Sequence, residues 1–318
     1  MMHALRAHAR GGPEVLVYEQ APTPALADSD ILVEVHAAAI TFDELTWAET
    51  WTRAGVDRTP VIPSHEFSGR VAEIGRAVTE FAIGDEVYGI VPFDRDGAAA
   101  EYVAVPADHS GAKPISLSHI EAAALPLPAL TAQQALFDHA HLSIGERVLV
   151  HGGAGGVGDY VVQMAAAAGA HVTATTRGGV EYVKALGASD VIDIRNDDFS
   201  TRAATFDVVL DTVSGDTLDR SYGLLRPGGR LITLQTPPDQ QRAARLGITA
   251  IFFIVTTDTP ALTNLAALVD SNALRVTIAA TFPLSQGAVA YASGARDGRR
   301  PGKTVLVVQQ QGGISDGR

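Results

Sequence analysis

The second half of the chain alternates short apolar segments with stretches of helical periodicity. Each apolar segment has the length of a buried strand and is bounded by turn-forming residues. Runs that are apolar throughout are typical of a parallel sheet covered by helices on both faces. The pattern therefore predicts a doubly wound α/β sheet of six strands, over residues 147–151, 171–175, 190–194, 206–212, 229–235 and 248–255.

The first third of the chain shows a different pattern, with closely spaced strands and turns. Residues 31–35 read ILVEV, residues 66–89 combine short strands with Gly and Asp turns, and a further strand is expected over 99–105. Such spacing predicts a small β-barrel. The stretch that follows is helix-forming, with a break at Pro126 and Pro128 that separates a short helix from a longer one.

The last part of the chain predicts helices over 261–271 and 286–295 and a final strand over 304–308. We expect this strand to return to the barrel, so that the α/β domain is inserted into a discontinuous partner. A length of 318 residues suits two domains. The predicted division is a barrel domain over 1–118, an α/β domain over 119–258 and a return to the barrel domain over 259–318.

Residues 148–158 read VLVHGGAGGVG, and the α/β domain is organised around this stretch. A strand leads into glycines and then into a helix, whose first backbone N–H groups converge on a phosphate. In the G-x-G-x-x-G frame, Gly153 allows a tight turn, Gly155 lets the backbone approach a diphosphate and Gly158 lets the helix lie against the strand. The motif predicts a dinucleotide site built from Gly153, Ala154, Gly155, Gly156, Val157 and Gly158.

Composition limits the classes of partner. Hydrophobic residues make up 46% of the chain and charged residues 19%, as in a folded globular protein. A net charge of -12 argues against nucleic-acid or anionic-membrane partners, which need a positive face. The chain has no cysteine, which removes disulfides and thiolate metal sites.

Motifs spread over nearly the whole chain carry a family resemblance. In order they read RAHARGGPEVLVYEQAPTP, AAAITFDEL, IPSHEFSGRVAEIG, GDEVYG, LPALTAQQAL, VLVHGGAGGVG, LGASDVID, DVVLDTVSG, LRPGGRLI and GKTVLVV. On these motifs the chain resembles the medium-chain dehydrogenase/reductase superfamily, and more narrowly its zinc-independent quinone reductase and enoyl reductase branch. The resemblance implies a GroES-like barrel domain, a Rossmann domain and a homodimer. It also implies NADPH and hydride transfer to a quinone or to the C=C bond of an α,β-unsaturated carbonyl, including polyketide-type enoyl substrates.

The residues at the zinc position do not form a zinc site. His65 and Glu66 stand where zinc-dependent relatives carry metal ligands, but Thr41 and residues 127–129 replace the cysteines. Tetrahedral zinc needs three or four ligands, and one His beside one Glu does not supply them. We therefore expect no metal. His65 is then either a structural or pocket-wall residue, or a catalytic one.

Cofactor choice depends on the residues that follow the second strand of the α/β sheet. A site for NAD places Asp or Glu there to bind the ribose 2′-OH, whereas the 2′-phosphate of NADPH is held by hydroxyls and a cation. The chain has Thr175, Thr176 and Arg177, with no acidic residue before Glu181. This favours NADPH, although an arginine after a strand can also be a solvated turn residue. Arg195, after the third strand, is a second candidate cation or a surface ion-pair partner.

The nicotinamide end of the cofactor is expected beyond the carboxyl ends of the later strands. The candidate residues there are Val213, Ser214, Gln235, Phe253 and Val255. In the family, the position of Thr131 lies beside the nicotinamide ring.

On the barrel side, the family resemblance places Thr41, Phe42, Glu44 and Trp47 in the segment that lines the substrate pocket. Here Thr41 stands where many members have Asn, and Glu44 where many have Asp. The hydroxyls of Thr41 and Thr131 and the ring of His65 are the candidate catalytic donors to the oxygen that becomes an enolate or hydroquinone.

Two other functions stay open. An alcohol or carbonyl dehydrogenase would need a metal or another Lewis acid near Thr41 and His65, and an NADPH-binding protein without turnover would need no general acid. No segment is apolar for long enough to span a bilayer, and we expect a cytoplasmic protein. The apolar sixth strand, as the last of the sheet, predicts pairing across a two-fold axis and hence a homodimer.

Overall fold

The computed structural model describes residues 1–295 and 298–309, which form two compact units. The first unit holds Met1–Leu127, Thr257–Arg299 and the chain from Lys303; the second holds Pro128–Thr256 and Arg300–Gly302. The second unit thus interrupts the first along the chain. The expected last segment, 259–318, extends into 310–318, which lie outside the described residues.

The first boundary between the units lies at Leu127 instead of at residue 118. Helix α2 (His119–Ala123) belongs to the first unit because its small apolar face packs against the buried alanines Ala37 and Ala39. A helix is part of the core against which it buries its apolar face. The sequence pattern of this stretch predicts a helix, but it does not predict the domain against which the helix packs.

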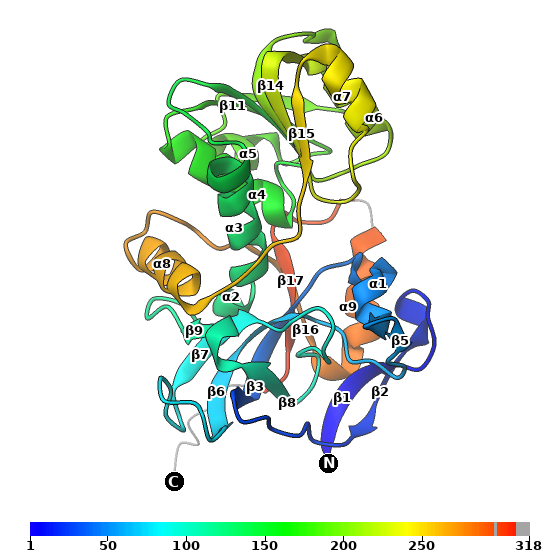
Figure 1. Cartoon of the computed structure of the whole chain (residues 1–318), viewed down its shortest axis with the longest axis vertical. Coiled ribbons are helices and arrows are strands. Elements are labelled where there is room, and N and C mark those ends of the chain that lie inside the picture. Colours follow the sequence, from blue (N-terminus) through cyan, green and yellow to red (C-terminus); the bar gives the residue numbers. More distant parts are fainter. Residues whose placement is uncertain (296–297, 310–318) are drawn as a thin grey trace. The chain divides into compact units, whose positions relative to one another are not determined.

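The second unit is a six-stranded sheet in which every strand pair is parallel (Figure 1). Its strand order is β12-β11-β10-β13-β14-β15. The strands are β10 (Arg147–His151), β11 (His171–Thr176), β12 (Asp190–Asp193), β13 (Phe206–Asp211), β14 (Leu225–Thr233) and β15 (Thr249–Phe252). The predicted doubly wound sheet is confirmed.

Four helices connect these strands: α4 (Gly156–Ala167), α5 (Val180–Ala185), α6 (Asp216–Ser221) and α7 (Gln240–Leu246). The chain moves from β10 outward to β12 and then restarts on the other side of β10 with β13. Because such crossovers are right-handed, α4 and α5 cover one face of the sheet and α6 and α7 the other. This is the Rossmann order, with its switch point between β10 and β13.

The sixth strand is shorter than predicted. Residues 248–255 are apolar, but β15 ends at Phe252. Phe253 stacks on His139, with ring centroids 4.3 Å apart, and the backbone of Thr256 exchanges two hydrogen bonds with the side chain of Gln134. Contacts with residues distant in sequence therefore end the strand before its apolar run ends.

The first unit contains a seven-stranded sheet with the order β16-β17-β3-β6-β7-β9, and β8 also pairs with β3 (Figure 1). All pairs are antiparallel except β16 with β17. The strands are β3 (Asp30–Ile40), β6 (Glu66–Ile74), β7 (Glu86–Ile90), β8 (Tyr102–Pro106), β9 (Ser110–Ala112), β16 (Ile278–Pro283) and β17 (Lys303–Val307). The last strand, β17, pairs with β3 of the same unit.

Two small hairpins complete the strands of the first unit: β1 (Met2–Ala7) with β2 (Leu16–Ala21), and β4 (Thr52–Arg53) with β5 (Val56–Asp57). No strand was predicted before residue 31. Ala4, Leu5 and Ala7 of β1 are buried in the core of the unit. Alanine and arginine weaken the strand signal of this segment, and burial against the rest of the unit supplies what local preference lacks.

The remaining helices are α1 (Ala48–Trp51), α3 (Pro126–Gln133), α8 (Thr259–Asp270) and α9 (Gly287–Ala292). The break predicted at Pro126 and Pro128 is confirmed, since α3 starts at Pro126. Both prolines lie in its first turn, where a missing N–H breaks no helical hydrogen bond. Within residues 1–295 and 298–309, no helix is both long and apolar enough to cross a membrane.

Candidate functional site

The glycine-rich turn connects β10 to α4. Its left-handed residue is Gly152, with φ of 77°, so the tight turn that we expected at Gly153 is made one residue earlier. Gly153 donates its N–H to the carbonyl of Thr175 at 2.9 Å, and a Cβ at Gly153 would lie 2.7 Å from Cβ of Ala174. The role of Gly153 is thus close contact with β11, and its N–H is not free for a phosphate.

The start of α4 lies directly on this turn. A Cβ at Gly158 would meet the carbonyl oxygen of Gly152 far inside van der Waals distance, so only glycine lets the helix lie this close. The N–H groups of Gly156, Val157 and Gly158 form the first helical turn and have no partner within the helix. They are hydrogen-bond donors at the positive end of the helix dipole.

The hydroxyls of Thr175 and Thr176 are committed inside the protein. Thr175 is buried, and its Oγ1 lies 3.2 Å both from the N–H of Gly152 and from Nδ1 of His151. Thr176 donates its hydroxyl proton to the carbonyl of Gly178. The expectation that both hydroxyls donate to a 2′-phosphate is therefore corrected, because neither proton is available.

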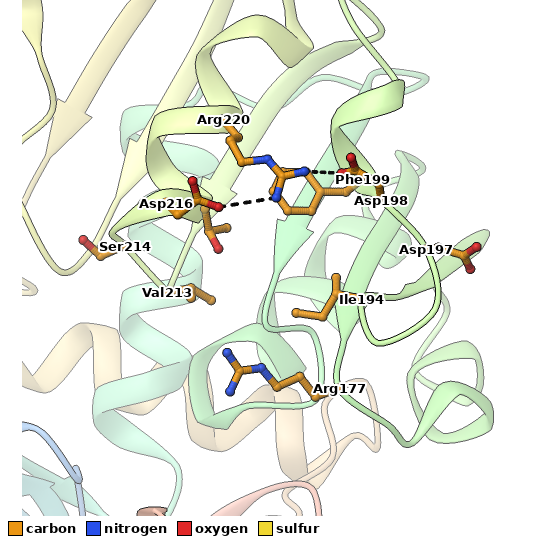
Figure 2. Close-up of a pocket in the computed structure, with 10 residues that line it drawn as sticks. Arg177, Ile194, Asp197, Asp198, Phe199, Val213, Ser214, Asp216 and Arg220 are labelled. Atoms are coloured by element: carbon orange, nitrogen blue, oxygen red, sulfur yellow. Dashed lines mark hydrogen bonds and ion pairs between the residues drawn. The ribbon is translucent and has the colours of Figure 1, made fainter.

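A pocket of about 510 Å³ lies beyond the ends of β11, β12 and β13. Figure 2 shows the guanidinium of Arg177 across the pocket from that of Arg220. The lining residues are Arg177, Ile194, Asp197, Asp198, Phe199, Val213, Ser214, Asp216, Thr217 and Arg220.

The two arginines of the pocket differ in their surroundings. Arg220 pairs with Asp198 and Asp216 and lies over the ring of Phe199, 4.5 Å from its centroid (Figure 2). Arg177 is exposed and makes no ion pair or hydrogen bond with any residue in 1–295 or 298–309. Arg177 is thus the cation of this pocket whose charge is not balanced by a carboxylate.

Arg195 does not serve the pocket. Its guanidinium binds both carboxylate oxygens of Asp193, with Nε 2.9 Å from Oδ1 and Nη2 2.5 Å from Oδ2. This pairing lowers the pKa of Asp193. Of the two readings of Arg195, the structure supports the surface ion pair.

The segment after β13 forms one wall of the pocket. Ser214 has φ of 69°, unusual for a residue with a side chain, and Asp211 holds it there by accepting hydrogen bonds from the N–H groups of Val213 and Ser214. The Ser214 hydroxyl lies 2.7 Å from Oγ1 of Thr236. Burial raises the pKa of Asp211. The expected residues Val213 and Ser214 do line the pocket.

The other residues expected at the nicotinamide end lie outside this pocket lining. Gln235 is exposed after β14, whereas Phe253 and Val255 are half-buried after β15. Thr131 is buried on α3 and belongs to the second unit.

In the first unit, Glu44 is fully buried, which corrects its assignment as a substrate-binding residue. Its carboxylate accepts hydrogen bonds from the hydroxyl of Tyr291 and from the N–H of Ser64, the latter at 3.0 Å. Burial raises the pKa of Glu44 to about 7, although both hydrogen bonds act against this. The carboxyl group therefore has a structural role that its sequence position did not show.

His65 is buried next to Glu44, with its Nε2 3.9 Å from a carboxylate oxygen. Its ring meets that of Phe93 edge-on at a centroid distance of 5.2 Å, and neither ring nitrogen has a hydrogen-bond partner in the described chain. Burial lowers the pKa of His65 to about 4, with Arg58 adding to the effect. The imidazole is thus neutral at physiological pH.

Thr41 and Glu66 are joined by Lys303, the first residue of β17. The ammonium group of Lys303 pairs with Glu66 and lies 3.3 Å from Oγ1 of Thr41. Glu66 also accepts the N–H of Leu127 at 3.3 Å. Because Lys303 donates to Thr41, the hydroxyl proton of Thr41 stays available.

The donor set here does not suit zinc. Glu66 is engaged by Lys303, and across the described residues no three His, Cys, Asp or Glu side chains form a group that could hold a metal. Phe42 lies under the guanidinium of Arg299, and Trp47 packs edge-on against Phe93. Both aromatic side chains are half-buried.

Four further candidates for a functional role were not predicted from the sequence: His151, Arg220, Tyr291 and Lys303. Two of them had a signal. Lys303 is a charged residue in an otherwise apolar strand, and His151 is a polar residue between an apolar strand and the glycines; both patterns indicate a buried group with a specific partner. Tyr291 had none, because its partner Glu44 is distant in sequence. Arg220 had only Asp216 four residues earlier, a charge spacing that is common on exposed helices.

Comparison with known proteins agrees with this architecture. A family model described as the alcohol dehydrogenase GroES-like domain matches residues 27–115, and one described as zinc-binding dehydrogenase matches residues 186–306. The human mitochondrial NAD(P)H oxidoreductase RTN4IP1 is 33% identical over 327 residues, covering 88% of this chain and 82% of that protein.

Two solved structures are similar over the whole chain. The quinone oxidoreductase from Coxiella burnetii has a TM-score of 0.90 and 31% identity, covering 97% of this chain and 99% of that one. The mycobacterial protein Rv1454c, solved as a complex with NADPH, has a TM-score of 0.84 and 26% identity, covering 97% and 100%. The first unit is thus a GroES-like domain and the second a Rossmann domain. The chain belongs to the quinone oxidoreductase branch of the medium-chain dehydrogenase/reductase superfamily, and it is an oxidoreductase that uses a nicotinamide cofactor.

Proposed function

We propose that the protein is an NADPH-dependent reductase that transfers a hydride to a quinone or to the C=C bond of an α,β-unsaturated carbonyl. The observation that carries the choice of NADPH is the unpaired guanidinium of Arg177 directly after β11. A 2′-phosphate is an anion that this group can bind through two N–H donors. No carboxylate stands between Thr175 and Glu181 to bind a 2′-OH instead.

The second unit is then the NADPH-binding domain and the first the catalytic domain. The first-turn amides of α4 fit a diphosphate, since a Cβ at Gly158 would close the approach between turn and helix. We assign Ala154, Gly155, Gly156, Val157 and Gly158 to the diphosphate. For the nicotinamide end, the sequence-based assignments of Gln235, Phe253, Val255 and Thr131 stand as part of this proposal.

On the substrate side we assign the donor role to Thr41, with His65 and Thr131 as further candidates. NADPH supplies the hydride, and negative charge then develops on the substrate oxygen. The Thr41 hydroxyl can donate its proton to that oxygen, and the ammonium group of Lys303 makes it a stronger donor. A neutral His65 can donate through one ring N–H. Polyketide-type enoyl compounds fall within the enone class of substrates.

We propose that this reaction needs no zinc. A zinc-dependent alcohol dehydrogenase holds its metal by three protein ligands. Here the carboxylate of Glu66 forms an ion pair with Lys303, so it is not free to bind a metal. We further propose a cytoplasmic homodimer.

Steady-state oxidation of NADPH by the purified full-length chain tests the proposal. The substrate panel holds a benzoquinone, a simple enone and an enoyl thioester. A separate reaction, the oxidation of a secondary alcohol with NADP⁺, tests for alcohol dehydrogenase activity. Each reaction is run with and without a zinc chelator. We expect turnover with a quinone or an enone, none with the alcohol, and no effect of the chelator.

Two outcomes would contradict the proposal. Activity confined to the alcohol arm and lost with the chelator would make the protein a zinc-dependent dehydrogenase. Tight binding of NADPH without turnover of any substrate would favour a binding protein instead.

A further inference from the structure

His151 is the last residue of β10 and is completely buried. Its two ring nitrogens each meet one hydroxyl: Nδ1 lies 3.2 Å from Oγ1 of Thr175, and Nε2 lies 3.0 Å from Oγ of Ser221. The ring also meets that of Phe199 edge-on, at a centroid distance of 4.7 Å. One imidazole therefore contacts β11, helix α6 and a wall of the pocket.

The partners of Ser221 decide which nitrogen carries the proton. The hydroxyl of Ser221 lies 2.6 Å from the carbonyl oxygen of Thr217, which can only accept. The single proton of Ser221 is therefore used there. Oγ of Ser221 must accept from His151, so Nε2 of the imidazole carries a hydrogen.

The other nitrogen then completes a directed chain. A neutral imidazole with hydrogen on Nε2 accepts at Nδ1, so Thr175 donates its hydroxyl proton to it. Oγ1 of Thr175 in turn accepts the N–H of Gly152 at 3.2 Å. Every donor between Gly152 and the carbonyl of Thr217 is thus matched to one acceptor, and only one tautomer allows this.

We propose that His151 is a positioning residue for the dinucleotide: as a neutral imidazole protonated on Nε2, it ties the glycine turn to helix α6. Through Thr175 it holds the left-handed Gly152 at the start of the turn. Through Ser221 it holds α6, whose first residues, Asp216 and Thr217, line the pocket. This role rests on the proposed function, because it takes the glycine turn and helix α6 to bind the same dinucleotide.

The surroundings keep this imidazole neutral. Burial lowers the pKa of His151 to about 4, and the nearby guanidinium of Arg220 adds to the effect. A protonated ring would have no lone pair to accept the hydroxyl proton of Thr175, and the chain of hydrogen bonds between Gly152 and α6 would be broken at Nδ1.

The tautomer can be measured directly on the wild-type protein. Long-range ¹H–¹⁵N correlation spectra distinguish a protonated from an unprotonated ring nitrogen. We expect the His151 signals to show hydrogen on Nε2 only, and not to titrate between about pH 6 and about pH 8. Hydrogen on Nδ1, or titration in this range, overturns the inference whatever the protein binds.

Three variants separate the hydrogen bond of His151 with Thr175 from its hydrogen bond with Ser221. The side-chain oxygen in His151→Asn can replace Nδ1 as acceptor, and the amide nitrogen in His151→Gln can replace Nε2 as donor, whereas His151→Leu replaces neither. We expect the Leu variant to weaken binding of NADPH and of 2′,5′-ADP about tenfold or more. The Asn and Gln variants should each recover part of this loss, and KM for NADPH should rise while kcat changes little.

His171→Leu is the matched control, because His171 is an exposed histidine at the start of β11. It should bind NADPH like the wild type. If the Leu variant does not fold, the Asn and Gln variants carry the test. Wild-type affinity in all three folded variants overturns the inference, whereas a wild-type protein that binds neither ligand contradicts the proposed function instead.

Discussion

Arg177 and Arg195 follow neighbouring strands of the same sheet, and their surroundings differ. Arg195 forms a two-point ion pair with Asp193, which compensates its charge. Arg177 has no such partner among the described residues and faces the pocket. Sequence position alone made both arginines candidates, but only Arg177 can bind a phosphate without first breaking an ion pair.

This difference predicts the cofactor preference of two variants. Arg177→Ala should weaken NADPH binding by about 10- to 100-fold, because a hydrogen bond to a charged group contributes roughly 1.5–3 kcal/mol. Binding of NADH should stay nearly unchanged, since it lacks the 2′-phosphate. Isothermal titration calorimetry with both cofactors measures the ratio.

Arg195→Ala is the matched control and should leave both affinities close to those of the wild type. An equal loss for NADH and NADPH in the Arg177 variant would assign the arginine to another part of the cofactor.

Glu44 predicts a dependence of stability on pH. Its pKa in the folded protein, about 7, lies above the ordinary value of 4.5. The folded protein thus holds this proton more tightly than the unfolded chain, and the resulting stabilisation is present below about pH 4.5 and lost as the pH rises through 7. Ionisation of the buried carboxyl should remove about 3 kcal/mol.

Glu44→Gln removes this titration while keeping an oxygen acceptor for Tyr291. The difference in unfolding free energy between variant and wild type should therefore move in favour of the variant by about 3 kcal/mol between pH 4.5 and pH 7. Urea unfolding of both proteins at several pH values measures it. Glu49→Gln, at an exposed glutamate of α1, is the matched control for the same change of side chain.

At the scale of elements, the contact between β10, the glycine turn and α4 is the most tightly constrained part of the Rossmann domain. Gly158 is on the helix and Gly152 is on the turn, and no side-chain atom fits between them. The amides that we propose for the diphosphate depend on this contact, because it sets where the first turn of α4 begins.

Gly158→Ala should therefore destabilise the protein by roughly 1–3 kcal/mol, as overpacking does, and weaken NADPH binding. Thermal unfolding and calorimetry measure the two effects. Gly223→Ala is the control, since a Cβ at Gly223 meets no atom within 4 Å. Normal stability and affinity in the Gly158 variant would show that turn and helix can separate without loss.

At the scale of the whole molecule, β15 forms one edge of the Rossmann sheet. Ile254, two residues after β15, is 56% exposed. An apolar segment at an open sheet edge is normally paired or covered. Pairing with a second copy about a two-fold axis would cover it and is the basis of the proposed homodimer.

Light scattering at micromolar concentration should give the mass of a dimer for the wild type. Ile254→Lys should shift the population toward monomer, because it places a charge in the paired edge. The exposed Ile115 of the first unit offers a control, and Ile115→Lys should leave the dimer intact. A monomeric wild type would rule out the proposed assembly.

Much of this fold is encoded locally. The apolar runs of the first five Rossmann strands and the two prolines at the start of α3 depend on near neighbours in sequence, and the structure has strands and a helix start at these places. The glycine spacing marked the turn before α4, although its left-handed residue is Gly152 and not Gly153. The N-terminal hairpin and the end of β15 were not predictable in the same way. Both depend on contacts with distant residues, such as the packing of Phe253 on His139.

The sequence by itself determined that this chain has a Rossmann sheet with a glycine-rich turn before its first helix, next to a strand-rich domain, because hydrophobic periodicity and glycine spacing act over a few residues. The tertiary structure alone decided which polar groups are free. It engaged the hydroxyls of Thr175 and Thr176, paired Arg195 with Asp193 and buried Glu44 in contact with Tyr291. Among residues 1–295 and 298–309 it gave Arg177 no ion-pair partner. The physical reason is that a hydrogen bond or ion pair is satisfied by whatever the fold brings within about 3 Å, and those partners are mostly remote in sequence.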